Sequence, residues 1–414
     1  MMNKTIAFHT LGCKLNYAET STYERGFVQA GLQVVPWEEP ADVYLVNTCS
    51  VTQRSEQKCR NLIRKMHRTA PEARIIVTGC YAQLRPADLE ALEGVARVFG
   101  AQEKNRVVPE TLALLREETP PPAPPESVLP AYSTGERTRS FLKVQDGCDN
   151  FCAYCTVPFA RGRSRNLAIA DLVPQAQAIA AQGVKEIVLT GVNTGDFGRT
   201  TGESFLDLLK ALDGVDGIER YRISSIEPNL ISDGIIDWIA SGTKFQPHFH
   251  IPLQTGTDTL LKRVGRRYTT DFFAGRIDRI RERIGGHVFF GIDVIAGLPG
   301  ETDEDFRQTY RFLEERIRPA YLHVFPYSRR PGTRAAAWPD QVRDGIKTER
   351  AAALEALCKR LHEAFREQNR GRKETVLWES DRKAGRMGGY TGNYLRVERP
   401  WDADRVGTLE EIIL

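Results

Sequence analysis

Short apolar runs of strand length alternate with amphipathic stretches over the first hundred residues. The runs are rich in β-branched and aromatic residues, as strands are, and cover residues 6–10, 43–47 and 75–79. The stretches between and after them are expected to be helical, over residues 18–30, 53–68 and 86–95. This alternation predicts a parallel, doubly wound α/β sheet in a first domain over residues 1–118.

A proline-rich segment ends this pattern. Residues 119–130 read TPPPAPPESVLP, and half of these positions are proline, which has no N–H to donate. We therefore expect a stiff, extended linker, which we place over residues 119–137.

The alternation resumes after the linker. Six further strands are predicted, at residues 141–145, 186–190, 220–225, 248–253, 289–297 and 321–327. Candidate helices lie between most of them, so we predict a parallel sheet curled into a partial (β/α) barrel over residues 138–371. Functional loops are expected at the carboxyl ends of its strands. A long helix over residues 341–369 closes this region.

Residues 372–414 have a different pattern. The short runs TVLWES, YLRVER and EEIIL are predicted strands, and the glycine-rich segments GRMGG and TGN are predicted turns. This part of the chain is therefore expected to be a small all-β module.

Composition narrows the class of protein. Of 414 residues, 41% are hydrophobic and 27% are charged, as in ordinary globular proteins. No apolar run approaches the length of about 18 residues that a membrane span needs, and the start, MMNKTIAFHTLGC, does not resemble a signal peptide. We therefore expect a cytoplasmic protein whose eight cysteines stay reduced and serve as metal ligands, nucleophiles or buried thiols.

Three cysteines lie close together after the strand at 141–145. Cys148, Cys152 and Cys155 have the spacing C-x3-C-x2-C. Three thiolates on one loop suit three irons of a [4Fe–4S] cubane and leave the fourth iron open for a small-molecule ligand. The alternative is a zinc loop that takes its fourth ligand from elsewhere in the chain. Tyr154, just before the last cysteine, is placed to lie against a bound adenine.

Another three cysteines each follow one strand of the first domain. Cys13, Cys49 and Cys80 come at the ends of the three predicted strands, and the carboxyl ends of neighbouring parallel strands lie together. Gly12 and Gly79 permit tight turns immediately before two of them. This pattern favours a second cluster, again with three protein ligands, over three unrelated buried thiols.

The two remaining cysteines are expected to be structural. Cys59 and Cys358 each belong to a stripe of apolar residues at helical spacing, so both should face a core rather than bind metal.

Basic residues gather in the second half of the chain. The net charge is only +3, but clusters occur at Lys262-Arg263, Arg266-Arg267, Arg329-Arg330 and along 359–373. Several clusters together suit an anionic polymer, while each one alone is compatible with a solvated helix face.

Together these motifs resemble the radical S-adenosylmethionine (SAM) methylthiotransferase family over nearly the whole chain. TLGCKLN around Cys13 and LTGVNTGDFG at 189–198 resemble the branch that acts on tRNA threonylcarbamoyladenosine, whereas other branches usually have GCQMN or GCPKN. Tyr17 departs from this branch, which commonly has Gln there. Three further motifs are similar to the family's barrel motifs and follow in the same order: HIPLQTGTDTLLKRVGRRYT (250–269), DVIAGLPGET (293–302) and HVFPYSRRPGT (323–333).

The resemblance implies a tRNA methylthiotransferase with three parts: an N-terminal methylthiotransferase domain, a radical SAM domain and a TRAM-like RNA-binding module. The cluster on Cys148, Cys152 and Cys155 would bind SAM and cleave it to a 5′-deoxyadenosyl radical. The cluster on Cys13, Cys49 and Cys80 would carry a sulfide that a second SAM methylates. SAM contacts are expected from Tyr154, Thr190, Gly191, Ser225, Glu227 and Gln254.

The implied product carries a methylthio group on C2 of N6-threonylcarbamoyladenosine at position 37 of tRNA. This base lies in the anticodon loop and must be splayed out of its stack. The RNA backbone would be held by the C-terminal module and by Lys262, Arg263, Arg266, Arg267, Arg329 and Arg330. The run RGRSR at 161–165 is placed to touch the substrate or the other domain. A monomer with an electron donor such as flavodoxin or ferredoxin is expected.

Other functions remain open at this point. The chain could modify another target of the same family, either isopentenyladenosine in tRNA or an aspartate of a ribosomal protein. It could instead be an iron–sulfur electron-transfer or scaffold protein without SAM chemistry, or a zinc-ribbon RNA binder.

Overall fold

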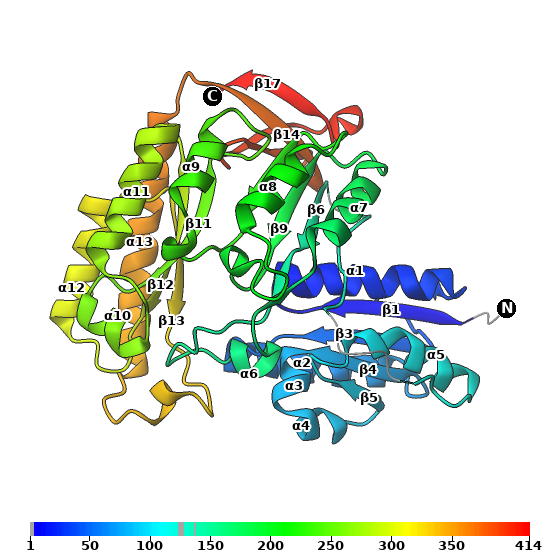
Figure 1. Ribbon diagram of the computed structural model, residues 1–414. Coiled ribbons are helices and arrows are strands. Elements are labelled where there is room, and N and C mark those ends of the chain that lie inside the picture. Colours follow the sequence, from blue (N-terminus) through cyan, green and yellow to red (C-terminus); the bar gives the residue numbers. More distant parts are fainter. Residues whose placement is uncertain (1–3, 123–127, 136–137) are drawn as a thin grey trace. The chain divides into compact units, whose positions relative to one another are not determined.

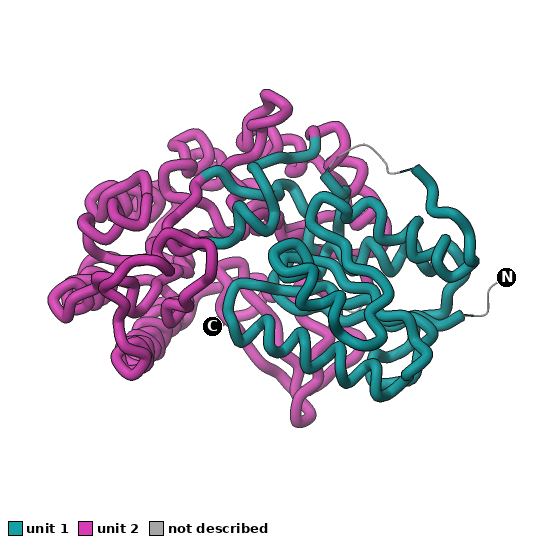
Figure 2. The backbone as a smooth tube through the Cα atoms, turned by 90° about the horizontal axis from the view of Figure 1, so that it is seen from below, with its two compact units in different colours: residues 1–133, 141–149, 155–167 teal, residues 134–140, 150–154, 168–414 magenta. Residues whose placement is uncertain are grey.

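The computed structural model describes residues 4–122, 128–135 and 138–414 (Figure 1). They form two compact units (Figure 2). Unit 1 contains the described residues of 1–133, 141–149 and 155–167, and unit 2 contains those of 134–140, 150–154 and 168–414.

Unit 1 is built on a five-stranded sheet in which every neighbouring pair is parallel. Its order is β2-β1-β3-β4-β5, with β1 at Thr5–Thr10, β2 at Gln33–Val34, β3 at Val43–Thr48, β4 at Arg74–Gly79 and β5 at Val95–Phe99. Its helices are α1 (Lys14–Gln29), α2 (Gln53–Thr69), α3 (Cys80–Leu84), α4 (Pro86–Glu90) and α5 (Val107–Arg116). The predicted doubly wound parallel sheet is confirmed.

One helix prediction in unit 1 is wrong in part. The helix expected over 86–95 ends at Glu90, and Val95 begins strand β5 instead. Val95 and Val98 pack against a buried hydrophobic cluster of the same sheet, and β5 pairs with β4. Pairing with the sheet therefore outweighs the local helical pattern.

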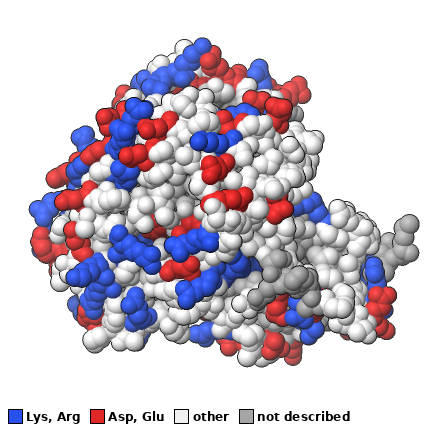
Figure 3. All heavy atoms as spheres, in the orientation of Figure 1, with Lys and Arg blue, Asp and Glu red and all other residues white. Residues whose placement is uncertain are grey.

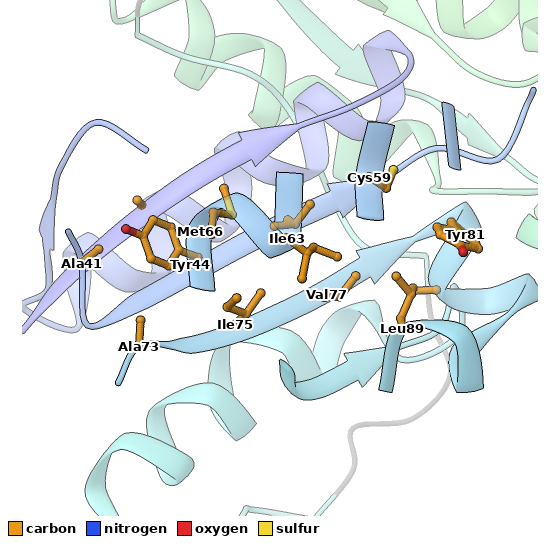
Figure 4. Close-up of a cluster of buried hydrophobic side chains, with 13 residues drawn as sticks. Ala41, Tyr44, Cys59, Ile63, Met66, Ala73, Ile75, Val77, Tyr81 and Leu89 are labelled. Atoms are coloured by element: carbon orange, nitrogen blue, oxygen red, sulfur yellow. The ribbon is translucent and has the colours of Figure 1, made fainter. Parts of the chain in front are cut away.

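Helices cover both faces of this sheet. On one face Cys59, Ile63 and Met66 of α2 pack onto Tyr44 and Val77 of the strands (Figure 4). The opposite face is covered by a second cluster, which includes Tyr23 and Phe27 of α1 and Val107 and Leu115 of α5. The helical stripe that contains Cys59 thus faces the core, as predicted.

The described part of the predicted linker is exposed at residues 119–122, which lie in no helix or strand, and is ordered against unit 1 further along. Ala131 and Ser133 are buried, and Tyr132 forms an antiparallel bridge with Leu142. The amide of Lys143 also donates to the carbonyl of Ala131 at 2.9 Å. Residues 123–127 and 136–137 of the predicted linker lie outside the described residues.

Unit 2 contains two three-stranded sheets, of order β6-β9-β10 and β11-β12-β13. The strands are β6 (Arg139–Lys143), which begins in this unit, β9 (Glu186–Thr190), β10 (Arg220–Ile223), β11 (His248–Gln254), β12 (Phe289–Ala296) and β13 (Tyr321–Pro326). The β9–β10, β11–β12 and β12–β13 pairs are parallel, and parallel bridges such as Ser225–His250 connect the two sheets.

Helices connect these strands as the sequence predicts, so the (β/α) arrangement is confirmed. They are α7 (Ile169–Ala180), α8 (Phe205–Asp213), α9 (Asp233–Ala240), α10 (Asp258–Val264), α11 (Thr270–Ile284), α12 (Asp303–Arg311) and the long α13 (Asp344–Gln368). Cys358 of α13 is buried against β13, where its thiol accepts a hydrogen bond from the amide of Leu322 at 3.2 Å.

The C-terminal module is an antiparallel sheet of order β16-β15-β14-β17, which confirms the all-β prediction. Its strands are β14 (Lys373–Lys383), β15 (Arg386–Thr391), β16 (Arg396–Pro400) and β17 (Leu409–Ile413). The prediction that GRMGG is a turn is wrong, because most of it lies in β15. A Cβ atom at Gly389 would stand 2.5 Å from Val376 and 2.8 Å from Trp378. Glycine is therefore required here because the side chains of the neighbouring strand pack close to the backbone, and not because the chain turns.

No helix within the described ranges combines the length and the apolar character needed to cross a membrane.

Candidate functional site

The C-x3-C-x2-C loop follows β7 (Gln145–Asp146) and precedes α6 (Val157–Arg161). Its two outer cysteines belong to unit 1, whereas residues 150–154 belong to unit 2. The amide of Cys148 donates to the carbonyl of Gly162 at 3.1 Å, and the amide of Val157 donates to the sulfur of Cys155 at 3.4 Å. The backbone therefore contacts the sulfur of a predicted cluster ligand.

Cys152 lies beside a buried cation of unit 2. Nη1 of Arg266 donates to the Cys152 sulfur at 3.4 Å, and Nη2 of the same side chain lies 2.5 Å from Oε2 of Glu227. Burial raises the pKa of Glu227, and Arg266 opposes that rise. Arg266 therefore connects a predicted cluster ligand with a predicted SAM contact.

The segment around Cys152 is fixed by backbone hydrogen bonds on both sides. The amide of Ala153 donates to Val264 at 2.8 Å, and its carbonyl accepts from the amide of Ala335 at 2.8 Å. Tyr154 packs against the apolar cluster that contains Ala153 and Tyr327. Residues 150–154 are therefore held by the end of α10 and by the short helical turn at Arg334–Ala337.

The other predicted SAM contacts lie where strands end. Thr190 ends β9 and Gly191 follows it, Ser225 and Glu227 follow β10, and Gln254 ends β11. In (β/α) folds this edge carries the functional loops. Gln254 has φ +74, a conformation that costs a non-glycine residue free energy and is often found at ligand sites.

In unit 1 the structure brings Cys13, Cys49 and Cys80 to the carboxyl ends of β1, β3 and β4. Gly12 and Gly79 precede two of them with φ of +115 and +101. A Cβ atom on Gly12 would stand 3.2 Å from the Cys49 sulfur, and one on Gly79 would stand 2.4 Å from the carbonyl oxygen of Thr48. Glycine is thus needed at both positions for the chain to approach so closely.

The three thiols affect one another's ionisation. Burial raises the pKa of Cys49 to about 12, and the charges of Cys80 and Cys13 add to this rise. Burial also raises the pKa of Cys80, but Arg161 and Lys104 oppose that rise. The thiols therefore lie close together, with cations next to Cys80.

These cations belong to a buried cluster of five charged side chains in unit 1, with side-chain exposures of 5% or less: Glu19, Asp146, Lys104, Lys143 and Arg161. The Glu19 carboxylate lies 2.7 Å from Lys104, 2.9 Å from Lys143 and 3.3 Å from Arg161. Asp146 lies 3.2, 2.8 and 2.9 Å from the same three cations. Three cations against two carboxylates leave an excess of positive charge beside Cys80.

Arg161 also links this cluster to the helix that starts at Cys13. Its guanidinium donates to the side chain of Asn16, whose amide nitrogen donates to the carbonyls of Leu11 at 2.8 Å and Thr48 at 3.0 Å. The carbonyls of Leu11 and Thr48 belong to the residues just before Gly12 and Cys49. Arg161 therefore holds the loops that carry these cysteines.

Sequence reasoning missed most of this cluster. It placed Arg161 near the substrate or the other domain, but it did not single out Glu19, Lys104, Lys143 or Asp146. One signal was available, since Lys143 and Asp146 interrupt an apolar strand directly before the cysteine loop. Charges at such positions are buried and require partners.

The residues of unit 1 fit an iron–sulfur cluster better than a single zinc ion. Thiolates around one tetrahedral zinc ion would lie about 3.8 Å apart, given Zn–S bonds of about 2.3 Å. Within the part of the chain that the structure describes, no three cysteine sulfurs all lie within 4.8 Å of one another. Cys13, Cys49 and Cys80 are thus close but more widely spaced than one zinc ion requires, and the cationic excess suits a thiolate-bound group.

The predicted RNA-binding residues fall into two groups. Lys262, Arg267 and Arg329 are exposed. The other three are engaged or buried: Arg263 pairs with Asp340 at 2.6 Å, Arg266 contacts Cys152, and Arg330 is 4% exposed. On the face shown in Figure 3, basic side chains gather toward the lower left, with acidic ones among them.

Two families match separate parts of the chain. The one described as "Uncharacterized protein family UPF0004" matches residues 5–100, and the Radical SAM superfamily matches residues 142–313. The chain is 39% identical to "Threonylcarbamoyladenosine tRNA methylthiotransferase MtaB" of Bacillus subtilis, over 99% of this chain and 93% of that protein. It is 31% identical to "tRNA-2-methylthio-N(6)-dimethylallyladenosine synthase" of Desulfitobacterium hafniense, over 99% of this chain and 95% of that protein.

The fold also resembles that of a solved structure. A radical S-adenosylmethionine methyltransferase, TsrM from Kitasatospora setae with cobalamin and a [4Fe–4S] cluster bound, aligns with a TM-score of 0.59. The alignment covers 81% of this chain and 77% of that one at 15% sequence identity, so the likeness concerns the fold alone.

Proposed function

Because the chain belongs to the radical SAM methylthiotransferase family, we propose that it adds a methylthio group to C2 of N6-threonylcarbamoyladenosine at position 37 of tRNA. The observation that carries this proposal is the convergence of Cys13, Cys49 and Cys80 at one sheet edge, in a chain that also has the C-x3-C-x2-C loop. One set of thiols serves radical chemistry, and a transfer of sulfur requires a second. The higher identity to the threonylcarbamoyladenosine relative than to the dimethylallyladenosine relative favours this substrate.

The two sets of cysteines would hold two [4Fe–4S] clusters, which with SAM supply the radical, the sulfur and the methyl group. On the radical side, Cys148, Cys152 and Cys155 are the ligands. Arg266 positions Cys152 through the hydrogen bond that it donates to the sulfur. The SAM contacts are Tyr154, Thr190, Gly191, Ser225, Glu227 and Gln254, which lie on the cysteine loop and at strand ends.

On the sulfur side, Cys13, Cys49 and Cys80 are the ligands, and the buried cations offset the negative charge of three thiolates. Arg161 acts as a positioning residue, because it ties the loops before the cysteines to the cluster of buried charges.

The proposal extends to domains and partners. Residues 1–118 would carry the sulfur-side cluster, 119–137 the linker, 138–371 the radical SAM domain and 372–414 a TRAM-like RNA-binding module. The tRNA anticodon loop would be held by this module and by the exposed cations Lys262, Arg267 and Arg329. The other predicted RNA-binding arginines would not contact the RNA, because Arg263 and Arg266 are paired and Arg330 is buried. A cytoplasmic monomer that receives electrons from a flavodoxin or ferredoxin completes the proposal.

Nucleoside mass spectrometry of tRNA tests the function directly. Cells that lack the protein should accumulate threonylcarbamoyladenosine without its 2-methylthio group, and the gene supplied in trans should restore that group. An unchanged level of the 2-methylthio product in the deletion strain would refute the proposal. Loss of 2-methylthio-isopentenyladenosine instead would assign the chain to the other tRNA substrate.

Cysteine variants test the division between the two sites. Anaerobically reconstituted protein should hold about eight irons, as two cubanes require. Cys152→Ala should lose SAM cleavage and product, whereas Cys49→Ala should retain SAM cleavage and lose only sulfur insertion. Cys358→Ala is the matched control, since this thiol is buried against β13, and it should keep all irons. If Cys152→Ala and Cys49→Ala behave alike, the proposed division is incorrect.

A further inference from the structure

Two imidazoles and a carboxylate meet on neighbouring strands of unit 2. His250 lies on β11, Asp293 on β12 and His323 on β13, and one ligand atom from each lies within 4.8 Å of the others. Nε2 of His250 lies 2.6 Å from Oδ1 of Asp293, and the two imidazole rings are 4.6 Å apart. The parallel register produces this meeting, because Asp293 pairs with His323 while His250 pairs with Gly291.

The strand that carries Asp293 is otherwise apolar. Gly291 on this strand has no side chain, and a Cβ atom there would stand 3.4 Å from Nε2 of His323. All three polar side chains are partly exposed rather than sealed in the core. Polar groups that converge in an apolar surrounding are typical of a binding site.

His323 also lines a cavity of about 430 Å³ between β13 and α13. Tyr321 and Phe325, on the same strand, line it as well and are 40% and 44% exposed, which is high for large aromatic residues. From α13 the cavity receives one carboxylate, one thiol and two basic side chains: Glu355, Cys358, Lys359 and His362. A ligand in this cavity would therefore reach the polar group through His323.

The charge of Asp293 also acts on a residue of the radical side. Burial is the main cause that raises the pKa of Glu227, and the charge of Asp293 contributes to the rise. Glu227 itself pairs with Arg266, which donates to Cys152.

We propose that His250 and His323, with Asp293 orienting His250, bind the carboxylate-bearing substituent on N6 of the substrate adenosine. This inference rests on the proposed function. Imidazole N–H groups can donate charge-assisted hydrogen bonds to the threonyl carboxylate, and the threonyl hydroxyl can donate to Asp293. An apolar N6 substituent would offer the two imidazoles no acceptor of this kind, and a site built to hydrogen-bond its ligand discriminates strongly against an analogue that lacks the polar group.

Binding measurements without turnover test the inference. The anaerobic holoenzyme, with no SAM present, is titrated with two fluorescent anticodon stem-loops, one with N6-threonylcarbamoyladenosine and one with unmodified adenosine at position 37. Wild-type protein should prefer the modified RNA by at least about tenfold, or about 1.4 kcal/mol. His323→Phe and His250→Phe should each reduce this preference below about threefold while binding the unmodified RNA as before. His287→Phe, at a half-buried histidine that precedes β12, is the matched control and should keep the preference.

Each other outcome overturns the inference. It fails if both variants keep the wild-type preference, or if they lose affinity for both RNAs equally, since the site would then not sense the substituent. It also fails if wild-type protein takes up one zinc ion per chain, beyond its iron, and His323→Phe does not, because the group would then be a metal site. A wild-type protein that shows no preference but makes the methylthio product refutes the inference alone, whereas absence of both preference and product refutes the proposed function.

Discussion

Glu186→Gln should detach the C-terminal module from the rest of unit 2. Glu186 is fully buried, and its carboxylate forms ion pairs with three arginines. It lies 2.8 Å from Arg222, 2.8 Å from Arg220 and 3.9 Å from Arg139. These arginines reach into the module. Arg220 donates to the carbonyl of Thr375 at 3.0 Å, Arg222 donates to that of Gly392 at 2.7 Å, and Arg139 pairs with Glu379 at 2.7 Å.

The expected loss of stability follows from the ionisation of Glu186. Burial works to raise its pKa, but Arg222, Arg220 and Arg139 lower it from 4.5 to about 2. This difference corresponds to about 3 kcal/mol at pH 7. Breaking a buried ion pair by removing one partner costs a similar amount, about 3–5 kcal/mol. For a unit of roughly 250 residues, a loss of about 3 kcal/mol lowers the melting temperature by roughly 6–12 °C.

The pH dependence identifies the charge as the cause. A depressed carboxyl pKa contributes stability above the ordinary value of 4.5, and this contribution is lost as the pH falls toward 2. The difference between wild type and Glu186→Gln should therefore shrink from about 3 kcal/mol at pH 7 to about 1 kcal/mol at pH 3.

Thermal and urea unfolding, followed by circular dichroism and tryptophan fluorescence, measure these differences, and limited proteolysis reports release of the module. Glu219→Gln is the control, because Glu219 is 52% exposed and lies 3.8 Å from Lys185, so its loss should cost less than about 1 kcal/mol. Equal stability of the Glu186 and Glu219 variants at pH 7 would refute the reasoning. So would a difference that stays constant down to pH 3.

Three further predictions concern other parts of the chain. Glu19→Gln leaves three buried cations facing Asp146 alone and should lower the free energy of unfolding of unit 1 by about 3–5 kcal/mol. Glu90→Gln, at an exposed residue, is the control and should change this free energy by less than about 0.5 kcal/mol. Glu301 has its pKa raised to about 7 by burial, so wild-type stability should fall as the pH rises from 4.5 to 7. Glu301→Gln removes the titrating group, so its urea midpoint should rise relative to that of wild type between pH 5 and pH 8. A difference in midpoint that stays the same over this pH range would contradict the prediction. Gly79→Ala should displace Cys80 and reduce the iron content from about eight to about four, whereas Gly31→Ala, with φ +90 but open space around it, should keep all irons.

The parallel arrangement of the strands at 6–10, 43–47 and 75–79 and the position of the cysteines after them were predictable together. Each of Cys13, Cys49 and Cys80 follows an apolar run, and parallel strands bring their carboxyl ends to one edge. No long-range information was needed, because the periodicity of each strand and the rule for parallel connections are both local. The same reasoning placed Cys59 and Cys358 in cores, where the structure has them.

Local patterns failed where packing decided the outcome. Glycines in GRMGG indicated a turn, but Gly389 is required because Val376 and Trp378 of the neighbouring strand occupy the space of a side chain. Arg266 was expected at an RNA surface because it belongs to a basic run, yet it is buried between Cys152 and Glu227. Sequence distance hides both relations, since the partners come from segments far away along the chain.

The sequence by itself determined the alternation of strands and helices, the two sets of three cysteines and the family to which the chain belongs. Only the tertiary structure decided which charges are buried and what they face: Glu19 and Asp146 among three cations, Glu186 among three arginines, and Asp293 between two histidines. The physical reason is that hydrophobic periodicity is a property of neighbouring residues. A buried charge, in contrast, is stable only with partners that the fold brings from distant segments.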